Sequence, residues 1–447
     1  MLNKNVIKMT SLLGALVMVG CTVPNGNVVN NNSGNVNNTN ASNLSAVMPE
    51  NYSGGQMAPE EGMIPGDNET KALSQASLNV FYHTLKKEND DSKNVLISPA
   101  SLTFAFGIAE NGAGGETLAQ MEDTVNGGVS IDDMNPLLNY ISYKLQNEDE
   151  VSWGVANSLW FNDDGTCKME DEFLKRAISY YDAEIYQKKF GGETTDEING
   201  WVADKTDNMI KKVLDQVDPN SRLFIINAMC FDGEWEKQYN ENDVVDGFTF
   251  TNADQSETDI SLLFSSEDKY FKLGEGIGFI KPYKGGEYAF VGILPDEGVT
   301  TEEYIKGLVD QNADFSEAVR NAKEGDVKVY LPEFETDYGN EMSSIYKEMG
   351  MNIPFDKNEA EFKGFFTNDE YSNVWIDRVI HKTHIEVDKK GTKAAAVTVI
   401  EVKEAATSAL EYEEKPVVIK LNRPFVYGIV DVETGVPIFL GCQNNMQ

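Results

Sequence analysis

Basic residues are scarce in this sequence, and their scarcity excludes several kinds of partner. The 447-residue chain has 37 lysines and arginines against 73 aspartates and glutamates, a formal net charge of −36. A surface this acidic repels nucleic-acid phosphates and anionic lipid headgroups. We therefore expect no nucleic acid, no heparin-like partner and no polybasic membrane anchor.

Motifs for metal binding and catalysis are also missing. The chain has three histidines, and its four cysteines show no CxxC spacing, so the sequence predicts no metal cluster, no dithiol site and no cofactor. GxSxG, HExxH and GxxxxGKS are absent. Ser98 and His381 could nominally form a triad with an aspartate, but nothing places Ser98 on a nucleophile elbow. The sequence therefore predicts a protein that is not an enzyme.

The first twenty residues have the pattern of a secretion signal. Lys4 and Lys8 precede the apolar run Met9–Gly20, which is too short to span a bilayer as a helix. The run ends before Cys21 in a pattern that resembles a bacterial lipobox, which implies a lipid on the Cys21 thiol. The alternative is an ordinary signal with a chance cysteine. Removing residues 1–20 leaves 35 basic and 73 acidic residues, a net charge of −38.

The next segment is a predicted disordered tether, residues 21–68. It is rich in Asn, Gly, Ser and Val, and it shows no hydrophobic period. A flexible chain of about 45 residues reaches roughly 35–40 Å. We expect it to hold a single globular domain, residues 69–447, away from a membrane, because no second linker of this composition follows.

Hydrophobic periodicity in the globular part indicates helices early and strands late. Apolar residues recur at helical spacing over 72–85, before the turn Asn89-Asp90-Asp91, and again over 198–214. Five runs are strand-like: 223–228, 288–294, 327–331, 417–421 and 425–430. This order favours an α+β fold over alternating βαβ units.

Many short motifs occur in one collinear order between Glu69 and Asn445. They include Asn94–Ser101, Asn111-Gly112-Ala113, Ile226-Asn227-Ala228 with Phe231, Gly233 and Trp235, Leu294–Gly298, Leu331–Phe334 and Asn422–Phe425. Together these stretches resemble the serpin family of serine-protease inhibitors. The resemblance implies a large, mainly antiparallel central sheet, two smaller sheets, eight or nine helices and an exposed C-terminal reactive loop.

The resemblance also implies a mechanism. In inhibitory serpins a protease cleaves the reactive loop, which then inserts as a new strand into the large sheet and carries the acylated protease with it. The loop here is residues 388–415. Family spacing from Gly391 places the scissile bond at Ala405–Ala406, with a register uncertain by about one residue. A methyl side chain suits the shallow pocket of elastase-like proteases, with subtilisin-like enzymes as a second class; a cut after Lys403 would instead indicate a trypsin-like target.

The loop sequence has the chemistry that a buried strand needs. Read with period 2, one face holds Thr392, Ala394, Ala396, Thr398, Ile400 and Val402 and carries no charge. The other face holds Lys393, Ala395, Val397, Val399, Glu401 and Lys403. The alternatives to insertion are a static edge strand, an ordinary exposed loop or, over residues 393–396, a turn of helix. The small hinge residues Gly391, Thr392 and Ala394–Ala396 favour insertion, whereas Lys389 replaces the acidic residue usual in inhibitory relatives.

Further positions match places that govern loop insertion in this family. Ser98, Ser101, Asn227 and His381 correspond to the polar shutter beneath the sheet, and Trp235 to the breach where insertion begins. Without the resemblance, His381 and Trp235 would be read as ordinary core residues. The sequence thus predicts a monomeric, cell-surface or secreted inhibitor of serine proteases; the alternative is a non-inhibitory serpin that acts as a surface binding or scaffold protein.

Overall fold

The computed structural model describes residues 54–60, 65–163, 168–206, 208, 210–367, 374–392 and 415–446, together with the backbone of 12–20. The helices within these residues are α1 (Asp67–Glu88), α2 (Pro99–Glu110), α3 (Gly115–Val125), α4 (Ile131–Gln146), α5 (Asp171–Tyr181), α6 (Gly192–Lys205), α7 (Thr301–Asp310), α8 (Phe315–Arg320) and α9 (Ser343–Glu348). The chain is α+β, as predicted.

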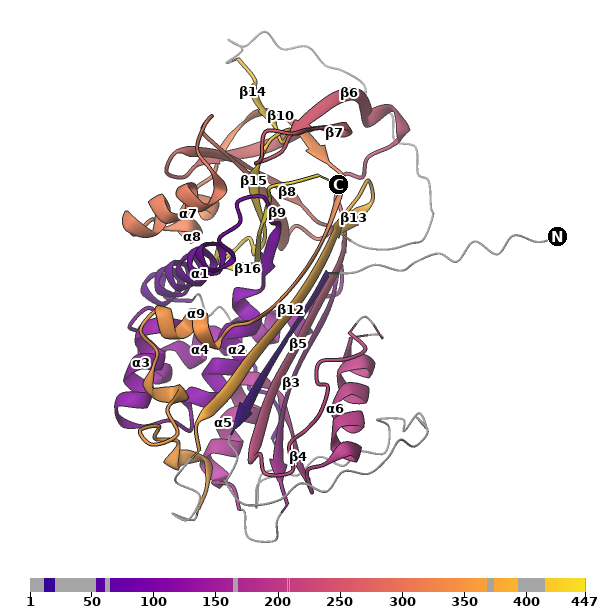
Figure 1. Cartoon of the computed structure of the whole chain (residues 1–447). Helices are drawn as coiled ribbons and strands as arrows, with labels where there is room; N and C mark the ends of the chain where they lie inside the picture. The colour runs from indigo at the N-terminus through magenta and orange to yellow at the C-terminus, as the bar shows by residue number, and fades with distance from the viewer. Residues whose placement is uncertain are drawn as a thin grey trace, which may run out of the picture.

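The large sheet crosses the lower part of the molecule in Figure 1. Its strands are β1 (Leu12–Gly20), β3 (Ser152–Asn162), β4 (Ala183–Lys188), β5 (Leu223–Glu234), β11 (Phe334–Glu341), β12 (Ile376–Val387) and β13 (Gly391–Thr392). From one edge to the other the order is β11, β12, then β13 and β1 in the same place, then β5, β3 and β4. All pairings are antiparallel except β3 with β4.

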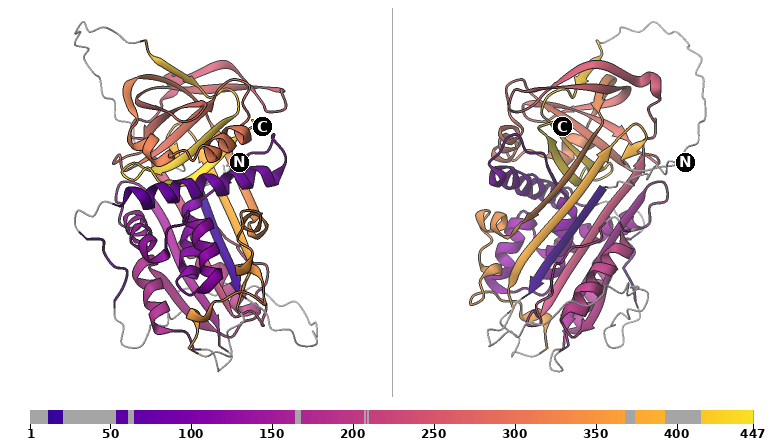
Figure 2. Two further views of the ribbon diagram at one scale, coloured as in Figure 1. Left: turned by 90° about the vertical axis from the view of Figure 1, so that its left-hand side faces the viewer. Right: turned by 45° about the vertical axis from the view of Figure 1, so that its right-hand side comes forward.

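A second sheet forms the upper part of the molecule (Figure 2). Its described strands are β2 (Val95–Ile97), β6 (Val244–Thr251), β7 (Glu257–Lys272), β8 (Gly276–Pro282), β9 (Tyr288–Pro295), β10 (Lys323–Pro332), β14 (Val417–Lys420), β15 (Phe425–Asp431) and β16 (Pro437–Gln443). The five strand-like runs of the sequence lie in β5, β9, β10, β14 and β15, so each of those predictions is confirmed.

The large sheet is covered on both faces, and β5 shows how. Its residues Leu223, Ile225, Met229 and Phe231 join the main core around α2, whereas Phe224, Ile226 and Ala228 join a second cluster beneath α6. Successive side chains of a strand point to opposite faces. Odd-numbered residues of β5 therefore face α2, and even-numbered residues face α6. A residue that pairs with an odd-numbered residue of β5 would share the face toward α2.

Of the two helices predicted from the apolar spacing, one agrees with the structure and the other is shorter than predicted. The first, α1, covers the predicted 72–85 and ends at Glu88, and the capping residue Asn89 has a left-handed φ of 49°. The second, α6, ends at Lys205, so the prediction of a helix to residue 214 was wrong. Beyond it, the Asn199 Oδ1 accepts hydrogen bonds from the backbone N–H groups of Val213 (2.8 Å) and Leu214 (3.0 Å). The apolar period persists because the chain folds back onto the same cluster.

Part of the predicted tether lies against the helices. The Met57 backbone N–H donates to the Ser179 carbonyl (2.8 Å), and Asn139 donates to the Met57 carbonyl (2.9 Å). Gln56 donates to the Ser142 hydroxyl (3.1 Å). Residues 54–60 are thus attached to α4 and α5, whereas 21–53 and 61–64 lie outside the described residues.

None of the helices in the described parts of the chain is long and apolar enough to cross a membrane.

Candidate functional site

The predicted hinge begins inside the large sheet. In β13, Gly391 pairs with Glu234 and Thr392 with Gly233 of β5, while Thr392 also pairs with Val387 of β12. The hinge therefore enters the sheet between β12 and β5, at the end that Figure 1 labels β13. A side chain at Gly391 would put its Cβ 2.1 Å from the Gly233 carbonyl oxygen, so this strand approach requires glycine.

Thr392, the next hinge residue, has no solvent exposure. Its hydroxyl lies 2.7 Å from the hydroxyl of Tyr283, which is also fully buried. Burial raises the pKa of Tyr283 above its ordinary value, so the phenol stays neutral and able to hydrogen-bond. A small polar side chain satisfies this position, whereas a charged one would be buried without a counter-ion.

Trp235 holds the backbone just before the hinge through two hydrogen bonds. Its indole stacks on Tyr283 with ring centroids 4.7 Å apart and an interplanar angle of 11°. The indole Nε1 donates to the Asp388 carbonyl (2.9 Å), and the Trp235 backbone N–H donates to the Lys390 carbonyl (2.9 Å). Two backbone carbonyls just before β13 are thus held by one residue.

A tight turn of residues 388–391 connects β12 to β13. The Asp388 Oδ1 accepts hydrogen bonds from the backbone N–H groups of Lys390 (2.7 Å) and Gly391 (3.0 Å). Lys389 lies in this turn, outside the strand ladder. Its Nζ is 2.8 Å from Glu241 Oε1, and this hydrogen bond raises the Lys389 pKa. The unusual lysine therefore does not enter the sheet in this conformation.

Ser98 and His381 form the first half of a buried polar cluster beneath the middle of the sheet. Both have no solvent exposure. The Ser98 backbone N–H donates to His381 Nε2 (3.0 Å), which ties the start of α2 to β12. The Ser98 Oγ donates to the Ile438 carbonyl (2.9 Å) and accepts from the Ser101 backbone N–H (3.2 Å) as the cap of α2.

The second half of the cluster crosses the sheet. The Ser101 hydroxyl donates to Asn227 Oδ1, and Asn227 Nδ2 donates to Asn157 Oδ1 (2.8 Å). Asn157 Nδ2 in turn donates to the Tyr181 carbonyl (2.6 Å). The chain of bonds thus links α2, β5, β3 and the end of α5, so the four predicted shutter residues lie together in two connected groups.

The contacts of Ser98 speak against a catalytic pair with His381. The imidazole accepts from the Ser98 backbone, whereas the Ser98 hydroxyl donates to the Ile438 carbonyl. A nucleophile needs its hydroxyl, rather than its amide, directed at the base. Both side chains are also closed off from solvent. The pair is arranged to hold α2 against the sheet.

The backbone of β1 continues the strand position that β13 begins. Leu12 pairs with Phe231 and Gly20 with Leu223 of β5, while β12 flanks the other side. Figure 1 shows this short strand between β12 and β5. If the β13 register continued, Ala394 would pair with Phe231 and Val402 with Leu223. Residues 12–20 thus occupy the nine ladder positions that residues 394–402 would take if the β13 register continued.

Several predicted site residues lie outside the described residues. They are Cys21, Ala394, Ala395, Ala396, Lys403, Ala405 and Ala406. In contrast, two residues that the sequence prediction missed contribute directly. Asn157 belongs to the buried polar cluster, and Tyr283 contacts Thr392 and Trp235 at the hinge. Asn157 stands in the apolar strand Ser152–Asn162, where a buried amide is unusual, and that was the available signal.

Comparisons with known proteins agree with this architecture. The family model described as Serpin (serine protease inhibitor) matches residues 72–446. Human Serpin B8 is 28% identical over 364 residues, covering 79% of this chain and 93% of its own. An uncharacterized serpin-like protein of Methanosarcina acetivorans is 29% identical over 376 residues, covering 81% and 82%. The native state of the thermophilic serpin tengpin matches with a TM-score of 0.75 and 35% identity, covering 88% of this chain and 97% of that one. The predicted fold is therefore confirmed.

Proposed function

Because this chain belongs to the serpin family, a family of protease inhibitors, we propose that it is a suicide-substrate inhibitor of elastase-like serine proteases. The proposal rests on one observation above all. Gly391 and Thr392 already form a strand between β12 and β5, and Thr392 is fully buried. A loop that continues this strand would enter the sheet once its distal end is cut.

The register supports burial of the uncharged face of the loop. Continued from β13, Thr398 would stand opposite Asn227, which points toward α2 and receives the Ser101 hydroxyl hydrogen bond. Ala394 and Ala396 would stand opposite Phe231 and Met229 on the same side. Directly opposed residues share a face of the sheet. The charged Lys393 and Glu401 would point to the other face.

Insertion would be strongly favourable and hard to reverse. A new central strand forms a ladder with both neighbours, and each backbone hydrogen bond contributes a net ~0.5–1.5 kcal/mol. Apolar burial against α2 adds to this. About 14 inserted residues would move the cut end by roughly 45 Å, at about 3.3 Å per residue. An attached acyl-protease would be carried over that distance before it can deacylate.

We further propose that the scissile bond is Ala405–Ala406, which makes elastase-like enzymes the preferred targets and subtilisin-like enzymes a second class. Residues 1–20 act as a secretion signal, and Cys21 carries a lipid that holds the monomeric domain at the cell surface. Removal of residues 1–20 would also remove β1 from the strand position that the loop needs. The net charge of −38 after processing is consistent with a function that needs no heparin-type cofactor.

A denaturing gel tests the proposal. The chain beginning at Cys21 is mixed with elastase, and the released fragment is sequenced from its N-terminus. We expect a complex that survives SDS and a new N-terminus at Ala406. A new N-terminus at Glu404 would indicate the Lys403 cut and a trypsin-like target. Cleavage with no complex would favour the alternative, a non-inhibitory surface binding or scaffold protein.

Two matched variants test whether insertion is the mechanism. Ala394→Arg places a charge on the face that would turn toward α2, and it should convert the inhibitor into a substrate. Ala395→Arg places the same side chain on the opposite face, and more of its complex should survive. Equal loss of complex in both variants would show that charge in the loop, rather than burial on one face, is what matters.

A further inference from the structure

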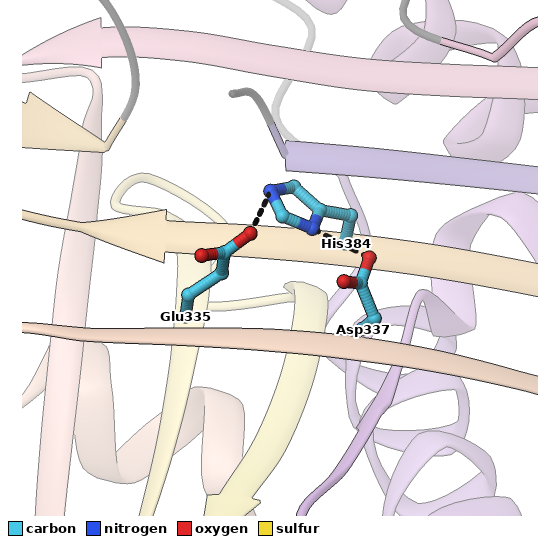
Figure 3. A group of neighbouring side chains, drawn as sticks. All are labelled: Glu335, Asp337 and His384. Carbon is cyan, nitrogen blue, oxygen red and sulfur yellow. Dashed lines mark hydrogen bonds and ion pairs between the residues drawn. The ribbon is translucent and has the colours of Figure 1, made fainter. Parts of the chain in front are cut away.

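A buried histidine lies between two carboxylates on the edge of the large sheet. His384 of β12 and Glu335 and Asp337 of β11 project on the same side of these strands, as Figure 3 shows. One ligand atom from each of the three lies within 4.8 Å of the other two. None of these residues takes part in the hinge or the shutter. The group is therefore a separate feature that needs its own explanation.

The hydrogen bonds of His384 fix which ring nitrogen is available. Nδ1 lies 2.7 Å from Asp337 Oδ1. Because a carboxylate accepts, the Nδ1 must carry the proton and donate. In the neutral ring Nε2 is then an acceptor. It is buried and has no hydrogen-bond partner within the described chain, and it lies 3.8 Å from Glu335 Oε1.

Two acceptors that face each other in this way suit a cation between them. The His384 side chain is only 9% exposed, so water does not readily satisfy its Nε2. The strand register adds a further carboxylate, because Glu386 stands directly opposite Glu335. Like charges directly across a ladder destabilise a sheet unless something neutralises them.

We propose that this group is a binding site for a zinc-like divalent transition-metal ion. His384 Nε2 and the Glu335 carboxylate are its ligands, and Asp337 is a positioning residue that orients the ring through Nδ1. Imidazole favours Zn²⁺ and its neighbours over Mg²⁺ or Ca²⁺. A carboxylate behind the imidazole is the usual outer partner of a zinc-bound histidine.

The geometry needs only a small adjustment. A tetrahedral zinc with bonds of about 2.1 Å to each ligand would bring the two atoms to roughly 3.4 Å. Glu335 is 53% exposed, so its carboxylate is free to rotate by the difference. Glu386, on the same face, or water completes the coordination. A neighbouring groove of about 400 Å³ is lined by Asp337 and His384 together with Lys211, Lys212 and Lys382.

A metal site with a single histidine has no recognisable sequence motif. The sequence prediction of no metal rested on the small number of histidines and on the lack of CxxC spacing, and a site with a single histidine needs neither a histidine cluster nor a CxxC motif. The competing arrangement is a protonated His384 that pairs with both carboxylates and needs no metal. The two arrangements differ in one measurable property, which is whether the protein binds zinc at this histidine.

Calorimetric titration of the full chain with Zn²⁺ tests the site. We expect one ion per chain at His384, and His384→Gln should abolish it. Glu335→Gln should weaken binding at least about tenfold, because it removes a charged ligand. Asp337→Asn should weaken it about 10–100-fold while keeping one ion per chain, since the amide can still accept from Nδ1 but carries no charge. The matched control is His83→Gln on α1, which should bind zinc like the unaltered chain.

Co²⁺ absorption provides a second readout that folding defects cannot imitate. The bound ion should show d–d bands without thiolate charge transfer, because the ligands are nitrogen and oxygen. If His384→Gln does not fold, the exposed Glu335→Gln variant decides the same question. Absence of zinc binding by the unaltered chain, or binding that survives both His384→Gln and Glu335→Gln, would overturn the proposal.

Discussion

The indole Nε1 of Trp235 donates a 2.9 Å hydrogen bond to the carbonyl of Asp388, three residues before the hinge glycine. This bond joins the residue that directly follows β5 to the turn of residues 388–391. It holds the backbone of Asp388, where the predicted loop begins. The same indole also stacks on Tyr283. A substitution that keeps an aromatic ring but removes the N–H group therefore measures what the hydrogen bond alone contributes to stability.

Trp235→Phe should destabilise the uncleaved protein and loosen the hinge. The phenyl ring retains much of the stacking but loses the N–H donor, which leaves a backbone carbonyl less well satisfied. Trp153→Phe is the matched control, since the Trp153 Nε1 is buried without a hydrogen-bond partner among the described residues. We expect Trp235→Phe to cost about 1 kcal/mol more than Trp153→Phe in denaturant unfolding. Equal costs would contradict an anchoring role.

Asn157 and Asn227 should behave as one coupled unit. Each alanine substitution leaves a buried partner unsatisfied, so each should cost about 1–3 kcal/mol of unfolding free energy. In a double-mutant cycle the combined variant should lose less than the sum, because the second substitution removes a bond that is already broken. Additive losses would mean that the 2.8 Å contact between them carries no coupling.

Glu110 should make stability fall as pH rises. Burial raises the pKa of this carboxyl from 4.5 to about 8, although Asn126 donates a hydrogen bond to it. Between those two values the folded chain holds a proton that the unfolded chain releases. Stability should therefore be greatest below about pH 4.5 for this group and decline toward pH 8, by at most about 1.4 kcal/mol per pH unit.

Glu110→Gln should flatten that decline, because the amide is neutral throughout. Unfolding midpoints in denaturant at pH 5, 6, 7 and 8 give the slope. Glu116→Gln on the exposed face of α3 serves as the control and should leave the slope unchanged. An unaltered slope in Glu110→Gln would show that the buried carboxyl does not titrate in this range.

Residues 12–20 should hinder inhibition wherever they are retained. Their backbone occupies the nine ladder positions that residues 394–402 would take if the β13 register continued. A chain that keeps residues 1–20 should therefore require more inhibitor per molecule of elastase inactivated than a chain that begins at Cys21. Removing only residues 1–11 leaves β1 intact and should not relieve the block. Identical stoichiometry in all three chains would mean that β1 leaves the sheet freely.

Much of the fold could be read from local patterns. The apolar period of 72–85 and the turn after it defined α1, and five short β-rich runs marked strands that all exist. The prediction failed beyond Lys205, where an apolar spacing that looked helical belongs to a segment folded back by the Asn199 side chain. Periodicity reports which residues become buried, but not whether helix or a side-chain-braced loop buries them.

The sequence by itself determined that every second residue from Thr392 to Val402 is uncharged and that a glycine precedes this run. Only the tertiary structure decided which residues contact one another. It brought Trp235 to Asp388, Asn157 to Asn227 and His384 to Glu335, from segments far apart in the chain. It also placed residues 12–20 where the loop would go, because backbone hydrogen bonds accept any extended strand and do not select one by its sequence.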